Sequence, residues 1–183
     1  MILLYHLARW EKGEYVHVEV REGQLMGVSS LVPERSLGEN YKVLVAVIEE
    51  YEALLKESKP DNLFGLLEDL KRHFPNHPKI VFSLSCAILE LFCKKVGLEL
   101  EEMFRTRSSI EPKEVMREAR SDLVFVEPEA IGHVLEVMGS ISLLKNTGKD
   151  VAVVKRTYPD PTTNVVLNFL SKLAGNFCRD DWR

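Results

Sequence analysis

The chain has 183 residues, of which 24 are Lys or Arg and 28 are Asp or Glu, and its formal net charge is −4 at neutral pH. This length allows one domain, or two small ones, with a real hydrophobic core. The basic residues are spread through the chain, which argues against a nucleic-acid-binding surface, and no apolar run is long enough to span a bilayer. We therefore expect a protein that binds neither nucleic acid nor membranes.

Residues 2–9, 15–21 and 25–32 predict three short strands, separated by turns at Lys12-Gly13 and Glu22-Gly23. In the middle segment, valine occupies every second position and polar residues fill the others, which is typical of an antiparallel strand with one buried face. The sequence therefore predicts a three-stranded antiparallel meander, whose apolar face needs a cover.

Three helical patterns supply that cover. Asn40 is suited to cap a helix over 41–56, and Asp61 is suited to cap a second helix that runs through Leu70. The third pattern, over 80–96, is apolar nearly all round, so we expect it to be the most buried helix.

The three cysteines, Cys86, Cys93 and Cys178, are an odd set without the spacing of a metal site. Cys86 and Cys93 lie two helical turns apart on one face, so we expect buried free thiols and a reducing, cytoplasmic location. The N-terminus also lacks the pattern of a secretion signal. Gln24 is the only glutamine while Glu and Lys are plentiful, a bias that is typical of thermophilic proteins.

The second half begins with a charged, polar stretch over 105–121, which we interpret as a linker region. Within it, Glu111-Pro112 is expected to start a short amphipathic helix through Val115 and Met116.

Two short runs rich in β-branched residues, Val124–Val126 and Val151–Val154, are typical of strands buried on both faces of a parallel sheet. A helical pattern over 131–144 lies between them, and Gly148 is placed to end it. A third strand is expected near Asn176-Phe177. The carboxyl ends of such strands are where α/β folds bind ligands.

This block resembles the last third of enolase, the glycolytic dehydratase of 2-phosphoglycerate. Enolases have a strand followed by I-G, a helix, a glycine and a second strand ending V-V-S-H-R-S, and then a helix ending A-G. The present chain has Ile131-Gly132, Gly148, the run Val153-Val154-Lys155-Arg156-Thr157, and Leu173-Ala174-Gly175 at matching spacing.

The first half resembles the capping domain of the enolase superfamily. Its loop Val32-Pro33 followed by Ser36-Leu37-Gly38-Glu39 is similar to the enolase loop V-P-S-G-A-S-T-G-E with one residue missing. The run K-K-V-G-L-E-L-E-E-M-F over 94–104 is similar to the family's A-x-A-L-G-L-P-L-Y motif. The resemblance implies an α+β fold with a capping domain over 1–104, a linker region over 105–121 and a partial α/β barrel over 122–183.

A closed eight-stranded barrel takes about 250 residues, so the middle strands are missing here. The family's magnesium-binding carboxylates belong to those strands, and we name no metal ligand and no cofactor. Magnesium is expected only if an enolase-like activity survives.

The resemblance also assigns candidate site residues. Glu127 stands where the family has its base lysine, so it is a weak candidate for a catalytic base if burial raises its pKa. Lys155, Arg156 and Thr157 replace the family's H-R-S, and with Ser36 they form a candidate anion site. The second family lysine aligns with Cys178, or else 178–181 aligns with a later C-R-S-E segment.

Each of these residues also has a purely structural interpretation. Glu127 and Glu129 flank Pro128 and favour the start of a helix, because negative charge suits a helix N-terminus. Lys155 and Arg156 form an ordinary solvated pair if no ligand binds there.

Three functions fit this pattern. The first is an enolase-like protein without catalysis that acts as an interaction or oligomerisation module, with a second copy or another protein as partner. The second is a binder of a small phosphorylated or carboxylate metabolite. The third is a lyase or isomerase with a non-standard site, similar to phosphopyruvate hydratase. The truncated sheet favours the first, because unpaired strand edges and apolar faces need a partner.

Overall fold

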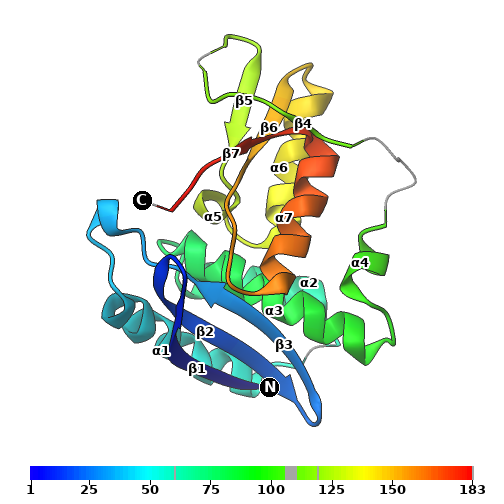
Figure 1. The fold of residues 1–183 in the computed structure, drawn as a ribbon. Helices are drawn as coiled ribbons and strands as arrows, with labels where there is room; N and C mark the ends of the chain where they lie inside the picture. The colour runs from blue at the N-terminus through cyan, green and yellow to red at the C-terminus, as the bar shows by residue number, and fades with distance from the viewer. Residues whose placement is uncertain (60, 106–110, 119, 183) are drawn as a thin grey trace.

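The computed structural model describes residues 1–59, 61–105, 111–118 and 120–182. The chain forms two layered units that share one long helix (Figure 1). The first unit has a three-stranded sheet with helices, and the second has a four-stranded sheet with helices. The predicted α+β fold class is confirmed. In the part of the chain that the structure describes, no helix is both long and apolar enough to cross a membrane.

The first sheet contains β1 (Ile2–Trp10), β2 (Gly13–Glu22) and β3 (Leu25–Leu31), paired antiparallel in that order. This is the predicted meander. Val16, Val18 and Val20 are fully buried on the face that packs against helices. The alternation in the sequence therefore identified the buried face correctly, because successive side chains of a strand point to opposite sides.

Helices α1 (Tyr41–Glu57), α2 (Leu63–His73) and α3 (Pro78–Lys95) follow, with a short 3₁₀ helix η1 (Arg35–Leu37) before them and α4 (Leu100–Met103) after them. Asn40 caps α1 as predicted. The predicted cap of α2 was wrong: Asn62 Oδ1 accepts a hydrogen bond from Gly65 N at 3.0 Å. Asp61 instead pairs with Lys95 Nζ at 2.6 Å, so its carboxylate is turned away from the helix end.

Helix α3 is the element that joins the two units, and its burial was predicted correctly. One side of it, including Leu84 and Ile88, packs with the first sheet, α1 and α2. The other side, including Phe82 and Leu89, packs with the second sheet, α6 and α7. A helix that is apolar all round is stable only when both of its sides are covered, and α3 is covered by two hydrophobic cores.

The second sheet is parallel, with strand order β4-β7-β6-β5. Its strands are β4 (Lys113–Glu114), β5 (Leu123–Val126), β6 (Asp150–Lys155) and β7 (Gly175–Arg179). Helices α5 (Pro128–Ile131), α6 (Val134–Asn146) and α7 (Pro161–Ala174) connect them. Val151 and Val153 face α6 and α7, in the same core as Val137 and Leu170.

Two details of this unit differ from the prediction. The prediction of a short helix after Glu111-Pro112 is wrong, because the chain forms β4 there. Val115 N continues the strand pairing by donating a hydrogen bond to Phe177 O at 2.8 Å. The helical run over 131–144 is divided at Gly132, whose φ of 154° interrupts the helix between α5 and α6.

The strand order shows how the sheet relates to a barrel. β4 is the first strand of the parallel unit and β7 is its last, yet the two are direct neighbours. First and last strands become neighbours when a parallel sheet closes on itself, as in an α/β barrel. The missing barrel strands would lie between β4 and β5, which stand next to each other in the order of the described strands. The sheet is therefore an open arc with β4 and β5 at its edges.

Buried polar contacts fix the second unit onto the first. Asp160, the N-cap of α7, accepts a hydrogen bond from Thr163 N at 2.7 Å and another from the Ser30 hydroxyl on β3. Glu90 on α3 accepts from Val28 N at 2.7 Å and from Thr162 Oγ1 at 2.8 Å. These contacts set the angle between the units, because an unpaired buried polar group is costly.

Candidate functional site

A cleft of about 250 Å³ lies where the two units meet. The loop after β3 and the start of α3 form one wall, and the carboxyl ends of β5 and β6 with α5 form the other. A second hollow, of about 390 Å³, adjoins it toward the C-terminal segment and shares Glu34, Leu37, Glu127 and Arg156 with it. This position agrees with the expectation that ligands bind at the carboxyl ends of parallel strands.

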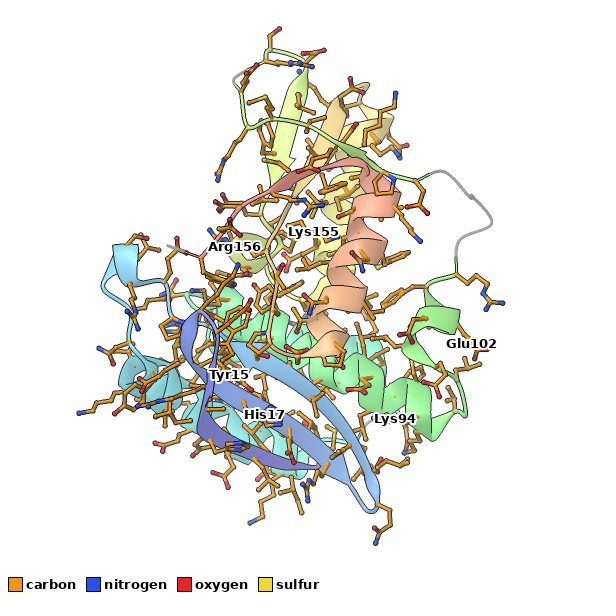
Figure 2. The ribbon with its side chains drawn as sticks, viewed as in Figure 1. Tyr15, His17, Lys94, Glu102, Lys155 and Arg156 are labelled. Atoms are coloured by element: carbon orange, nitrogen blue, oxygen red, sulfur yellow. The ribbon has the colours of Figure 1, made fainter. Side chains whose placement is uncertain are left out.

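Arg156, labelled in Figure 2 where the two units meet, lines both hollows and contacts partners from several elements. Its Nη2 lies 2.9 Å from Asp180 Oδ2, and its Nη1 lies 3.4 Å from Glu34 Oε2 and 3.8 Å from Glu129 Oε2. The ring of Trp182 lies against the guanidinium, with its centroid 4.7 Å from Cζ. Arg156 is thus already engaged by carboxylates and an aromatic face.

Glu129 is the most strongly perturbed acid of the cleft. Burial raises its pKa to about 7, against the lowering effect of Lys79 and Arg156 and with a small further rise from Glu34 and Glu127. Its Oε2 is shielded from solvent and has no hydrogen-bond partner among the described residues. A carboxyl in this state can hold or release a proton near neutral pH, and it can accept a hydrogen bond from a ligand.

The other cations around the cleft are paired as well. Lys79 Nζ lies 2.5 Å from Glu39 Oε2, and Arg117 Nη2 lies 2.5 Å from Glu127 Oε1. Arg117 also approaches Asp180 Oδ2 at 3.4 Å. The site is therefore a network of ion pairs in which each of these cations contacts at least one carboxylate.

The structure brings together only part of the predicted anion site. Ser36 and Arg156 both line the second hollow, where the Ser36 hydroxyl donates to Glu34 Oε1 at 3.3 Å. Thr157 uses its carbonyl to accept a hydrogen bond from Trp182 Nε1 at 2.8 Å. Lys155 lies on another side of the strand end, nearer α7, with its Nζ 5.1 Å from the Phe177 ring centroid (Figure 2). Burial, aided by Arg179, lowers the pKa of Lys155.

Glu127, the candidate base, occupies the N-cap position of α5 without a capping hydrogen bond to its side chain, and it lines both hollows. Its side chain is 41% exposed and pairs with Arg117. Glu129, two residues further on, has the buried position that a carboxyl base requires. The sequence interpretation assigned Glu129 to the helix start alone, although its place just after the apolar strand β5 was a usable signal.

The resemblance to enolases raises the question of a magnesium site, but the described residues do not fit a magnesium ion. Within residues 1–59, 61–105, 111–118 and 120–182, no three His, Cys, Asp or Glu side chains converge in a way that could hold a metal ion. The carboxylates around the cleft point instead at Lys79, Arg117 and Arg156. We therefore derive no chemical step through a metal.

Solved structures share this fold. The dipeptide epimerase from Methylococcus capsulatus, complexed with Mg ion, matches with a TM-score of 0.52 at 19% identity, over 98% of this chain and 50% of that chain. The dipeptide epimerase from Enterococcus faecalis V583 matches with a TM-score of 0.52 at 12% identity, over 95% and 48%. The muconate lactonizing enzyme from Pseudomonas putida matches with a TM-score of 0.51 at 15% identity, over 94% and 56%.

The chain thus spans about half the length of the structures it matches. The sequence matches no protein-family model, and no curated protein matches it. At these identities the likeness concerns the fold alone: the chain has the fold of about half of each of these enzymes, a three-stranded antiparallel sheet with helices followed by an open parallel sheet with helices. This confirms the architecture that the resemblance implied.

Proposed function

We propose that the protein binds a small molecule in the cleft between its two units and does not carry out metal-assisted enolase chemistry. The observation that carries this proposal is the cleft of about 250 Å³ at the carboxyl ends of β5 and β6, with Glu129, whose Oε2 is shielded from solvent, in its wall. Ligand sites are concave and mostly apolar, with a few convergent polar groups. The cleft has this composition, and its volume lies just below the usual range of roughly 300–1,000 Å³.

A direct test is thermal unfolding of the protein with a library of small metabolites, followed by the same measurement on a variant with a filled cleft. A ligand at about a hundred times its dissociation constant adds roughly 2.7 kcal/mol, which raises the midpoint of a chain of this size by roughly 5–10 °C. Ala130 lines the cleft and is exposed, so Ala130→Phe should fill the cleft without disturbing a core.

Ala53→Phe is the matched control, because Ala53 is exposed on α1 and does not line the cleft. We expect Ala130→Phe to abolish the ligand-induced shift and Ala53→Phe to preserve it. If the two variants respond to ligands alike, the cleft is not the binding site. Phosphoenolpyruvate and 2-phosphoglycerate, each with and without magnesium, belong in the library, because a magnesium-dependent shift would favour the lyase alternative over this proposal.

The open sheet supports a second candidate, an interaction or oligomerisation module. No described strand pairs with the outer edge of β5, and that strand is wholly apolar. Its pairing places Phe125 opposite Ala152, on the sheet face that points away from α6 and α7. An unpaired apolar edge is a template for association with another chain.

Light scattering coupled to size-exclusion chromatography tests this candidate. We expect a dimer or larger assembly that Phe125→Lys weakens, since a charge on the open face opposes burial there. A monomer at every accessible concentration would contradict self-association through β5.

A further inference from the structure

The charges around the two hollows are unbalanced. Among the described residues that line them, the acidic side chains are Glu34, Glu39, Glu127, Glu129, Asp180 and Asp181, and the lysines and arginines are Lys79, Arg117 and Arg156. Acids therefore outnumber these permanent cations by six to three. Lys12, which lies outside the lining, pairs with Asp181 at 3.2 Å and offsets one more charge.

Each lining cation is already committed. Arg156 is shared by Asp180 and Glu34, while Lys79 and Arg117 pair with Glu39 and Glu127. Lys79 and Arg156 also lie against the ring of Trp182. A phosphate or carboxylate entering the cleft would have to displace an existing carboxylate from a cation, and it would add negative charge to an acidic surface. The negative charge of such a ligand would be repelled by the carboxylates that line the cleft.

The remaining unsatisfied group is an acceptor. Glu129 lines the cleft, and its side chain keeps 13% of its surface exposed there. Its Oε2 is shielded from solvent, accepts no hydrogen bond from a described residue, and lies 3.8 Å from Arg156 Nη1, beyond hydrogen-bond distance. A buried acceptor without a donor is costly, and a charged donor is the strongest partner for a carboxylate. What the cleft lacks is therefore an N–H donor with positive charge.

Apart from the charged residues, Asn76 and His77, the cleft wall is apolar. It is formed by aliphatic side chains and prolines from the loop after β3, α1, the start of α3, α5 and β6: Leu37, Leu44, Pro78, Ile80, Pro128, Ala130 and Val154. These side chains would cover the hydrocarbon part of a ligand, while the donor meets Glu129. Burial of that hydrocarbon supplies affinity, and the polar contact fixes orientation.

We propose that the cleft selects a small organic cation, a primary ammonium or guanidinium compound with an aliphatic body, whose N–H group donates to Glu129. This inference rests on the proposed binding function and narrows it to a ligand class. It also replaces the expected phosphorylated or carboxylate ligand with one of opposite charge. The orphaned acceptor and the surplus of carboxylates are the two observations that support it.

Three probes of nearly equal shape test the charge preference: cyclohexylammonium, cyclohexanecarboxylate and the neutral cyclohexanol. Dissociation constants are measured by NMR titration of the full chain near pH 8, where Glu129 is ionised, with inorganic phosphate as a further probe. We expect the dissociation constant of cyclohexylammonium to be lower, by a factor of about ten or more, than that of either other cyclohexyl compound. Its affinity should fall as the pH is lowered toward about 6, because Glu129 then gains a proton.

Glu129→Gln keeps the shape of the side chain and removes its charge. We expect it to weaken cyclohexylammonium binding about tenfold or more and to leave cyclohexanol binding unchanged. The matched control is Glu57→Gln, because Glu57 is exposed at the end of α1 and outside the cleft. That variant should bind every probe as the parent protein does.

The outcomes separate this inference from the proposed function. If cyclohexanecarboxylate or phosphate binds more tightly than cyclohexylammonium, or if Glu129→Gln leaves the ammonium affinity unchanged, the charge assignment is wrong while a binding cleft still stands. If none of the charged or neutral probes binds and no metabolite shifts the thermal midpoint, then the charge assignment and the proposed binding function are both wrong.

Discussion

Glu129→Gln replaces a buried ionisable carboxyl with a neutral side chain of the same shape, and it should change how the stability of the protein depends on pH. The pKa of Glu129 is about 7 in the folded protein, against 4.5 for an ordinary glutamate, because burial disfavours the charged form. The folded state therefore keeps this proton over a pH range in which the unfolded chain has lost it. Between about pH 4.5 and pH 7, the contribution of Glu129 to the stability of the parent protein therefore falls as the pH rises.

The size of this loss follows from the two pKa values. One pKa unit corresponds to about 1.36 kcal/mol, so a rise from 4.5 to about 7 is worth at most about 3.4 kcal/mol. Solvent screening reduces this value only in part, because the Glu129 side chain is 13% exposed. Glutamine has no proton to exchange in this range. We expect the variant and the parent to be similar near pH 4.5, and the variant to be more stable by about 1–3 kcal/mol near pH 8.

Urea unfolding of both proteins at several pH values between about 4.5 and 8 measures this difference directly. Because other titrating groups are common to both proteins, the difference between their free energies of unfolding isolates Glu129. A difference that stays constant across the range, or that grows in favour of the parent as the pH rises, would refute the reasoning. It would show that Glu129 is ionised at little cost and that nearby cations outweigh its burial.

Three further predictions concern the fold. Asp160→Ala removes the cap of α7 and the acceptor for the buried Ser30 hydroxyl, so urea unfolding should show a loss of about 2 kcal/mol, whereas Asp160→Asn, which retains a capping oxygen, should lose less. Gly27→Ala would place its Cβ 1.7 Å from the Ala87 carbonyl oxygen of α3 and should prevent folding as judged by circular dichroism, while Gly139→Ala meets nothing within 4 Å and should gain up to about 1 kcal/mol; equal behaviour would contradict the close packing of β3 on α3. Cys86, Cys93 and Cys178 are buried free thiols, and burial raises the pKa of Cys93 to about 11, so a thiol reagent should modify them only after denaturant is added; rapid labelling of the native protein would be the contrary result.

The sequence by itself determined the local elements and the faces they bury. Alternating valines identified β2 and its buried side, and the continuous apolar pattern of α3 identified the helix that lies between two cores. The motifs shared with enolases also indicated the order of the two units. These features could be predicted because strand and helix periodicity are properties of neighbouring residues, which the sequence shows directly.

Only the tertiary structure decided how distant segments meet. β4 has two residues and no periodicity of its own, and it is a strand because β7, far along the chain, pairs with it. Arg156 looked like a free cation, yet Glu34 from the other unit and Asp180 from the C-terminal segment approach it. Glu129 lies in the first turn of α5, as the sequence indicated, but only the tertiary structure shows that its neighbours in space desolvate its carboxyl. Charge pairing and burial depend on which groups the fold brings within a few ångströms, and sequence separation does not reveal those distances.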